Sequence, residues 1–339
     1  MNKLVAFFIP LSLLFLFSCK SNDGYKPNAG GKAGDMLIVM KAKYKASDAG
    51  KVIKEMMSQP YLGLPQEEPL FNVQMAPYDN LNDFMKTMRN LILVSITPKA
   101  ENDTVLYYKD AWAKGQAMVR INAKTEQEFI NLIRRNEASL IDFFNTAERE
   151  RAMKYYRKYI NKEFSDKIKA KFGIFVSVPT GYKRINEKKN FIWMSEGNAG
   201  ASEGLIVYSY PYTGKGTFLK ESLLNKLNEV LKNNVPGPAD GSYMSIEMLF
   251  PPIYKAVNVG DEKVAEIRGL WKVVGDMMGG PWIMHAHLDK YKQRVIVVFG
   301  YVYAPEERKR DKIRQMEAVL YSYKNLNKPK EKAKAEEGK

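Results

Sequence analysis

The sequence predicts an α+β fold in which antiparallel sheets carry helices packed on one face, in two consecutive subdomains. The hydrophobic period changes from 3.6 residues to 2 at Phe172, directly after a long amphipathic stretch. Each half also contains strands joined by short turns and closes with a helix, a layout typical of antiparallel pairing. We therefore expect an N-terminal subdomain at 35–171, ending in a long helix, and a C-terminal subdomain at 172–324.

Short apolar runs and turn residues define the first elements of the N-terminal half. Ser47 or Asp48 is expected to cap a helix that ends near Met57. Four proline or glycine residues make Gln59–Phe71 a loop. The other expected elements are strands at 36–40, 71–75, 91–96, 104–108 and 116–122 and a short helix at 81–88.

A capping box, Thr125-x-x-Glu128, opens the long helix or helix pair over 125–171. Its apolar residues recur at spacings of three and four, as on one face of a helix. The stripe loses this period between Asn145 and Arg151, so we expect a break there.

The C-terminal half alternates in hydrophobicity, as strands do. Asp289–Gln293 is expected to form the turn of a hairpin, and Thr217 to cap a helix that ends before Pro236. Pro305 is expected to begin the last helix. The strands are expected at 172–178, 191–194, 204–210, 243–248, 264–274, 282–288 and 295–303.

The ends of the chain indicate a lipoprotein. The apolar run Val5–Phe17 follows Lys3 and is shorter than the ~20 residues of a spanning helix. Residues 16–19 at the end of this region are Leu-Phe-Ser-Cys, which looks like a bacterial lipobox. The only cysteine, Cys19, would be the lipidated residue. The alternative is an ordinary secretory signal that happens to end at a cysteine. We expect a signal peptide at 1–18, a flexible tether at 19–34 and a disordered charged tail at 325–339.

The net charge is +15, and a large part of it lies between Arg149 and Lys189, where 13 basic and 4 acidic residues occur. Such a stretch indicates an anionic neighbour, for example anionic lipid, lipopolysaccharide or an acidic envelope protein. The alternative is the solvated face of a long helix. Nucleic acid is not an expected partner for an exported lipoprotein.

The segment WIMHAHLD contains both histidines of the chain. His285, His287 and Asp289 share one face of a strand, so the two imidazoles can reach one zinc ion, with Asp289 or another carboxylate as the third ligand. The alternative is a solvated face of an amphipathic strand.

Two further segments carry weaker chemical suggestions. Gly214, Lys215, Gly216 and Thr217 lie between a strand and a helix, where free N–H groups can bind an anion; a plain glycine linker explains them equally. Ser202 fits G-x-S-x-G, but a strand follows it, so a hairpin loop is favoured over a hydrolase elbow. Alternating aromatics in YSYPY and FGYVY favour cross-strand packing over an exposed patch.

The lipobox and the segments GDMLIVM, LPQEEPLF, RNLILVSI and WIMHAHL together resemble an uncharacterised family of Bacteroidota lipoproteins, a domain of unknown function. The resemblance implies a cell-envelope lipoprotein and no assigned activity. Some proteins of this phylum carry an acidic run after the lipidated cysteine that directs them to the cell surface. Only Asp23 is acidic here, which favours an outer-membrane lipoprotein facing the periplasm. The C-terminal layout is also loosely similar to PsbP-like and Mog1-like folds.

Three classes of function remain open: a non-enzymatic binding or scaffolding lipoprotein, a metal-dependent hydrolase using His285 and His287, and a carrier of a small anionic or lipidic ligand. Histidine is scarce and few ionisable residues form a tight group, so we favour the first class. A deep pocket would favour the carrier.

Overall fold

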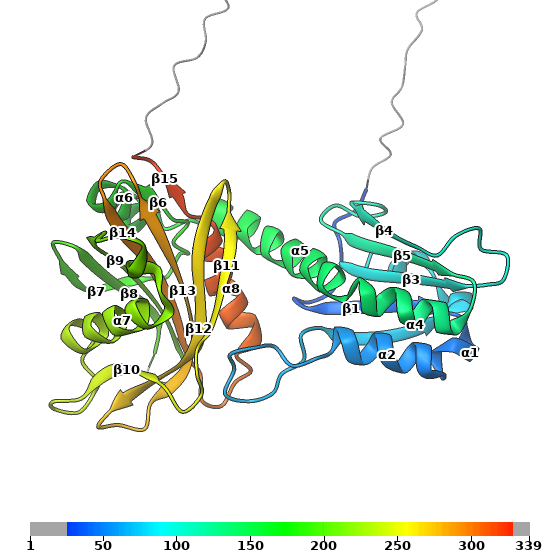
Figure 1. The fold of residues 1–339 in the computed structure, drawn as a ribbon, viewed down its shortest axis with the longest axis horizontal. Coiled ribbons are helices and arrows are strands. Elements are labelled where there is room, and N and C mark those ends of the chain that lie inside the picture. Colours follow the sequence, from blue (N-terminus) through cyan, green and yellow to red (C-terminus); the bar gives the residue numbers. More distant parts are fainter. Residues whose placement is uncertain (1–25, 199, 328–339) are drawn as a thin grey trace, which may run out of the picture.

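The computed structural model describes residues 26–198 and 200–327, which form two subdomains connected by the long helix α5 (Glu137–Lys158) (Figure 1). The α+β class is confirmed. The expected signal peptide, Cys19 and residues 328–339 of the expected tail lie outside the described residues. Residues 26–34, expected in a flexible tether, run along the N-terminal subdomain, where Ala29 N donates to Lys114 O (2.9 Å) and Gly30 N to Thr87 O (2.9 Å).

The N-terminal sheet is largely parallel, in the order β2-β1-β3-β5-β4. The pairings β2–β1, β1–β3 and β3–β5 are parallel, and only β5–β4 within this described sheet is antiparallel. The expected antiparallel pairing is therefore wrong here, because crossover connections return the chain in the same direction: helices connect β1 to β2 and β2 to β3, and the strand β4 lies between β3 and β5. The strands are β1 (Asp35–Met40), β2 (Asn72–Pro77), β3 (Asn90–Ile96), β4 (Thr104–Lys109) and β5 (Ala117–Ala123).

Helices cover the N-terminal sheet unequally. Apolar residues of α2 (Asp48–Met57), α4 (Glu126–Arg135) and the first half of α5 pack on one face. The short helices η1 (Tyr78–Asn80) and α3 (Asp83–Lys86) lie over the smaller core of the other face, and α1 (Ala42–Lys45) precedes α2.

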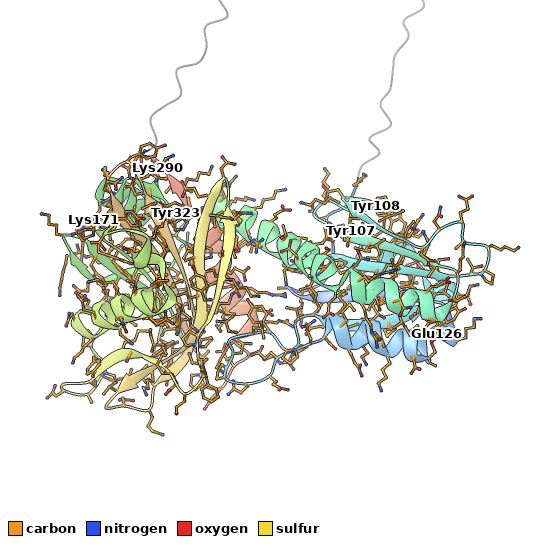
Figure 2. The ribbon with its side chains drawn as sticks, in the orientation of Figure 1. Tyr107, Tyr108, Glu126, Lys171, Lys290 and Tyr323 are labelled. Carbon is orange, nitrogen blue, oxygen red and sulfur yellow. The ribbon has the colours of Figure 1, made fainter. Side chains whose placement is uncertain are left out.

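Two helix N-termini in this subdomain test the caps predicted from the sequence. Thr125 accepts a hydrogen bond from Glu128 N (3.2 Å), which confirms the capping box. Ser47 is the N-cap residue of α2, but its side chain does not cap; the carboxylate of Glu126 accepts from Ala49 N (2.9 Å) instead. Glu126 therefore connects α4 to α2. It lies at the end of the N-terminal subdomain that is far from the C-terminal subdomain, and the exposed Tyr107 and Tyr108 of β4 lie near the upper edge of the same subdomain (Figure 2).

The helical segment over 125–171 consists of α4, α5 and α6 (Lys162–Phe172), with interruptions at Asn136 and at 159–161. The expected break between Asn145 and Arg151 is wrong, because α5 continues through it. The apolar period is lost there since the helix leaves its own sheet and contacts α8 through charged residues such as Arg149, which pairs with Glu317.

The C-terminal sheet is antiparallel throughout, as expected, in the order β10-β12-β13-β14-β9-β8-β7, with β11 also paired to β12. Helices pack on both faces, contrary to the expectation of one: α7 (Lys220–Asn234) on one and α8 (Arg310–Tyr321) on the other. The strands are β7 (Lys183–Lys188), β8 (Phe191–Gly197), β9 (Ser202–Pro211), β10 (Tyr243–Glu247), β11 (Ile253–Val259), β12 (Glu262–Val274), β13 (Gly279–Asp289) and β14 (Arg294–Tyr303), with the short pair β6 (Ile174–Phe175) and β15 (Lys324–Asn325).

Helix α8 begins at Arg310, five residues after the expected start at Pro305. Its first N–H groups are bound by a carboxylate from the other subdomain: Glu68 accepts from Lys309 N (2.6 Å) and Arg310 N (3.1 Å). No local pattern in the sequence could show a cap from so far along the chain.

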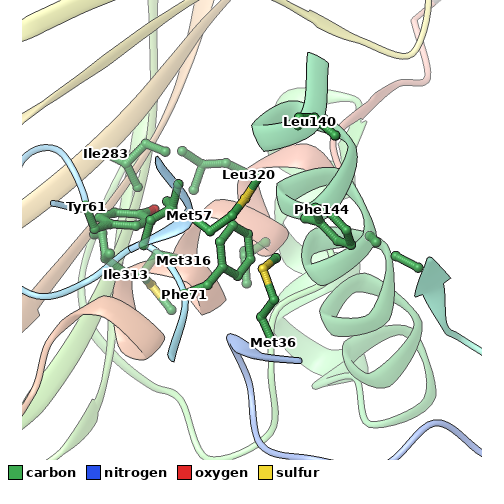
Figure 3. Packing of buried hydrophobic residues seen from close by; sticks show 14 of the residues in the cluster. Met36, Met57, Tyr61, Phe71, Leu140, Phe144, Ile283, Ile313, Met316 and Leu320 are labelled. Carbon is green, nitrogen blue, oxygen red and sulfur yellow. The ribbon is translucent and has the colours of Figure 1, made fainter. Parts of the chain in front are cut away.

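The two subdomains share one hydrophobic core. Met36 and Phe144 of the N-terminal part belong to the same buried cluster as Ile283 of β13 and Met316 and Leu320 of α8 (Figure 3). The loop before β2 contributes Tyr61, Leu70 and Phe71 between them. This shared core makes α8 and the end of the loop the contact surface between the subdomains.

Candidate ligand site at the domain junction

Helices α5 and α8 cross at the junction, and a cavity lies on each side of the crossing. The larger has a volume of about 470 Å³ and the smaller about 340 Å³. Asn145, Arg149 and Glu317 line both. Arg149 and Glu317 pair at 2.9 Å and thereby separate the two spaces.

The floor of the larger cavity is built around Glu148 of α5. Its carboxylate pairs with Arg89 (2.8 Å) and with Arg151 (2.8 Å), and it accepts from Asn90 Nδ2 (2.7 Å) and Gly34 N (3.2 Å). Burial alone opposes ionisation of Glu148, but the Arg151 and Arg89 guanidinium groups outweigh it and hold its pKa below the usual range.

Arg314 of α8 closes the floor from the C-terminal side. Its Nη2 donates to Leu70 O (2.8 Å) and Asn145 Oδ1 (3.0 Å), and its guanidinium lies 4.9 Å from the centre of the Phe71 ring. Gly34, with φ +75°, leaves the space that this arginine needs, because a Cβ there would lie 3.1 Å from Arg314 Nη1.

Three buried guanidinium nitrogens of arginines that line this cavity have no hydrogen-bond partner among the described residues: Nε of Arg89, Nε of Arg151 and Nη1 of Arg314. Arg314 is only 9% exposed. A buried donor without an acceptor costs ~1–3 kcal/mol, so three of them in one cavity are a conspicuous feature.

The outer wall of the larger cavity is aromatic. Ala152, Tyr155 and Tyr156 of α5 line it, and Tyr155 is 59% exposed. The Tyr155 and Tyr156 rings meet edge to face at 5.5 Å. The cavity therefore combines a cationic floor with an aromatic rim.

The smaller cavity is walled by a buried network of alternating charges. Arg268 of β12 contacts Glu266 (2.7 Å), Glu317 (3.1 Å) and the hydroxyl of Tyr61 (2.7 Å), which in turn donates to Glu317 (3.0 Å). Burial raises the pKa of Tyr61 to about 12, so it is a neutral donor. Tyr321 stacks under Arg149 at 3.8 Å. Because these groups pair with one another, this cavity offers fewer free donors to a ligand.

The expected metal ligands do not converge. His285, His287 and Asp289 are fully buried beneath α8 and the segment after it, so the alternative of a solvated face is also wrong. His285 Nε2 lies 3.0 Å from Glu266, His287 stacks on Tyr323 at 3.5 Å, and Asp289 accepts from Arg294 and Asn327. Within residues 26–198 and 200–327 no three histidine, cysteine or acidic side chains are placed to hold a metal ion.

The expected anion loop is not at the start of a long helix. Lys215–Phe218 forms a short 3-10 helix, η2, and α7 starts at Lys220 with Leu219 as its N-cap. Thr217 bonds the hydroxyl of Thr213 (3.1 Å) instead of capping α7. Gly214 and Gly216 have open space around them. The four residues therefore lie in a partly exposed connection.

Two interpretations of the strands are confirmed. Ser202 begins β9 directly after the turn of the β8–β9 hairpin. A hairpin at this position was predicted in preference to a hydrolase elbow, because a strand follows Ser202. Tyr208, Phe299 and Tyr301 are buried beneath α7, as expected for packing aromatics.

Sequence reasoning missed the junction site because its residues come from three distant segments. The basic stretch pointed at Arg149 and Arg151, but part of it is consumed internally by Glu148, Glu317 and Glu187. One signal in the sequence could have indicated the site: acidic residues and arginines occur together at helix positions where the apolar period predicts hydrophobic residues. No helix in the described part of the chain is long and apolar enough to cross a bilayer.

Comparison with known proteins finds the two halves separately. Residues 29–157 match the family model DUF8532, and residues 161–322 match DUF4837, each described as a domain of unknown function. No curated protein matches the chain.

Two solved structures show remote likenesses to this chain. The Ran-binding protein Mog1p of Saccharomyces cerevisiae is 12% identical, with 46% of this chain and 92% of that chain covered at a TM-score of 0.27. LpqN of Mycobacterium tuberculosis, described as involved in cell envelope biogenesis, is 13% identical, with 43% and 79% covered at a TM-score of 0.26. The N-terminal half is thus similar to the domain of unknown function DUF8532, and the C-terminal half is similar to DUF4837.

Proposed function

We propose that the protein is a non-enzymatic binding module of the cell envelope that carries a small ligand in the larger cavity at the α5–α8 crossing. The observation that carries this proposal is the cavity itself: both subdomains wall it, and its volume of about 470 Å³ lies in the range of small-molecule sites. Its cationic floor and aromatic rim favour the carrier among the classes that the sequence left open.

The proposal includes the anchor. Lipidation at Cys19 would hold the protein on a membrane, since acyl chains contribute ~0.8 kcal/mol per buried methylene. We place the body on the periplasmic side of the outer membrane, because the residues after Cys19 lack an acidic run. Anionic lipid, lipopolysaccharide or an envelope protein remain partners for the exposed lysines of the basic stretch.

The test is retention of a small molecule. The full chain is incubated with a small-molecule extract of the envelope, desalted and denatured, and the released compounds are identified by mass spectrometry. Ala152→Trp fills the cavity, and Ala170→Trp places the same side chain on an exposed helical position of α6 as the matched control. We expect a compound retained by the wild type and by the control but lost from Ala152→Trp. Equal retention by all three proteins, or by none, would contradict the proposal.

A further inference from the structure

The unpartnered donors of the larger cavity come from three separate segments. Arg89 precedes β3, Arg151 lies in α5, and Arg314 lies in α8. Each arginine is held by its other nitrogens: Arg89 by Glu148, Arg151 by Gly115 O (2.7 Å) and Arg314 by Leu70 O (2.8 Å). The guanidinium groups are thus fixed in place, and one buried N–H of each has no acceptor among the described residues.

The charges around these donors do not balance. Arg149 is paired with Glu317, and Asp311 is bound by Arg310. The three remaining arginines share one carboxylate, Glu148, which leaves about two positive charges in excess. Mutual repulsion follows, because Arg89 and Arg314 act together with burial to lower the pKa of Arg151. An anion in the cavity would relieve both the repulsion and the unmade hydrogen bonds.

The number of arginines and their excess charge select the kind of anion. A carboxylate presents two oxygens in one plane and is satisfied by a single guanidinium fork. Three arginines around one cavity suit a tetrahedral group with three free oxygens, and a phosphate monoester also carries about two negative charges near neutral pH. The half-buried Ala152 and the rings of Tyr155 and Tyr156 offer an apolar surface beside it.

We propose that Arg89, Arg151 and Arg314 bind the phosphate group of a phosphomonoester ligand, whose organic part lies against Tyr155 and Tyr156. This inference rests on the proposed function and adds the ligand class. The phosphate can belong to a soluble compound or to a lipid headgroup, because both present the same three oxygens.

The test measures binding to the full chain by titration calorimetry with defined probes. Phenyl phosphate, inorganic phosphate, short-chain phosphatidic acid below its micelle concentration, benzoate and phenol are compared. We expect phenyl phosphate or phosphatidic acid to bind more tightly than inorganic phosphate, and phenol not to bind. The better of the two organic phosphates identifies a soluble or a lipid source. Binding of benzoate with equal or higher affinity, or failure of all three phosphates, would overturn the phosphate assignment.

Variants locate the site. Arg314→Met is expected to weaken phosphate binding about tenfold or more, as is Arg151→Lys, which keeps the charge but loses the guanidinium geometry. Arg268→Met is the matched control, a largely buried arginine at the same junction that lines the smaller cavity, and its affinity should change less than about threefold. An equal effect of all three variants would contradict the site.

A measurement on the wild type covers the case in which a variant does not fold. The Nε–H resonances of Arg89 and Arg151 in ¹⁵N-labelled chain should shift on addition of phenyl phosphate, and Nε–H of Arg268 should not. Unmoved resonances would overturn the inference. Retention of a neutral compound that Ala152→Trp abolishes, with no phosphate binding, would leave the proposed function standing and reject only the phosphate.

Discussion

The guanidinium of Arg149 in α5 lies 2.9 Å from the carboxylate of Glu317 in α8, at the point where the two helices cross. This ion pair joins the subdomains and separates the two junction cavities. Burial opposes ionisation of Glu317, but Arg268 and Arg149 outweigh it and lower its pKa. The pair therefore has to be charged in the folded protein, and several consequences can be measured.

Glu317→Gln should destabilise the fold strongly, because it leaves Arg149 largely buried without its counter-charge and Arg268 with Glu266 alone. We expect a loss of ~3–5 kcal/mol in the free energy of unfolding, measured by urea denaturation. Glu229→Gln removes an exposed helical pair with Lys226 and should cost less than ~1 kcal/mol. Similar losses for the two variants would show that the buried pair does not hold the subdomains together.

Glu68→Gln tests the cap that one subdomain supplies to the other. An amide NH₂ would replace one of the two oxygens that accept from Lys309 N and Arg310 N, and would oppose a donor with a donor. We expect a loss of ~1–2 kcal/mol by thermal unfolding. Glu67→Gln, next in sequence and exposed, is the control and should leave the melting temperature unchanged.

Gly34→Ala tests the space beside the arginines. Gly34 and Gly241 have nearly the same φ, +75° and +74°, so an alanine at either incurs the same backbone penalty of ~1–2 kcal/mol. At Gly34 the new Cβ would also lie 2.9 Å from Arg310 Nη2, whereas Gly241 has nothing within 4 Å. We expect Gly34→Ala to lower the melting temperature more than Gly241→Ala; equal changes would exclude a close contact.

His287 should make stability fall in mild acid. Burial lowers its pKa from 6.5 to about 4, so the unfolded chain takes up a proton first as pH falls below 6.5, and the folded state loses stability until pH reaches its own pKa. His287→Phe keeps a ring against Tyr323 and removes this loss.

Between about pH 7 and about pH 5 the wild type should lose about 2 kcal/mol more than His287→Phe, measured by urea unfolding at each pH. The comparison with the variant is needed because burial raises the pKa of Glu203 to about 7, which stabilises the folded state over the same range as pH falls. Parallel pH profiles for the two proteins would contradict a buried neutral histidine.

Cys19→Ser should abolish lipid attachment, because the thiol is the only one in the chain. Expressed in a bacterial host with labelled palmitate, the wild type should incorporate label and fractionate with membranes, whereas the variant should do neither. Ser18→Ala, which keeps a small residue before the cysteine, should still be labelled. Label in Cys19→Ser would reject the lipobox.

Much of the fold followed from local patterns. The capping box at Thr125, the β13–β14 hairpin around Asp289 and the aromatic packing of Tyr208 were all predictable, because each depends on residues a few positions apart. The helix caps at Ala49 and Arg310 were not, since Glu126 and Glu68 come from distant segments.

By itself, the sequence determined the α+β class, the antiparallel C-terminal sheet and most of its strands, because hydrophobic period and turn residues act locally. Only the tertiary structure decided the parallel N-terminal sheet, the second helix layer that buries His285 and His287, and the junction of α5 with α8. The candidate site belongs to this second group. Its three arginines come together only when the two subdomains pack through a shared core. Charged residues that are far apart in the sequence produce no periodic pattern, so periodicity in the sequence could not predict the site.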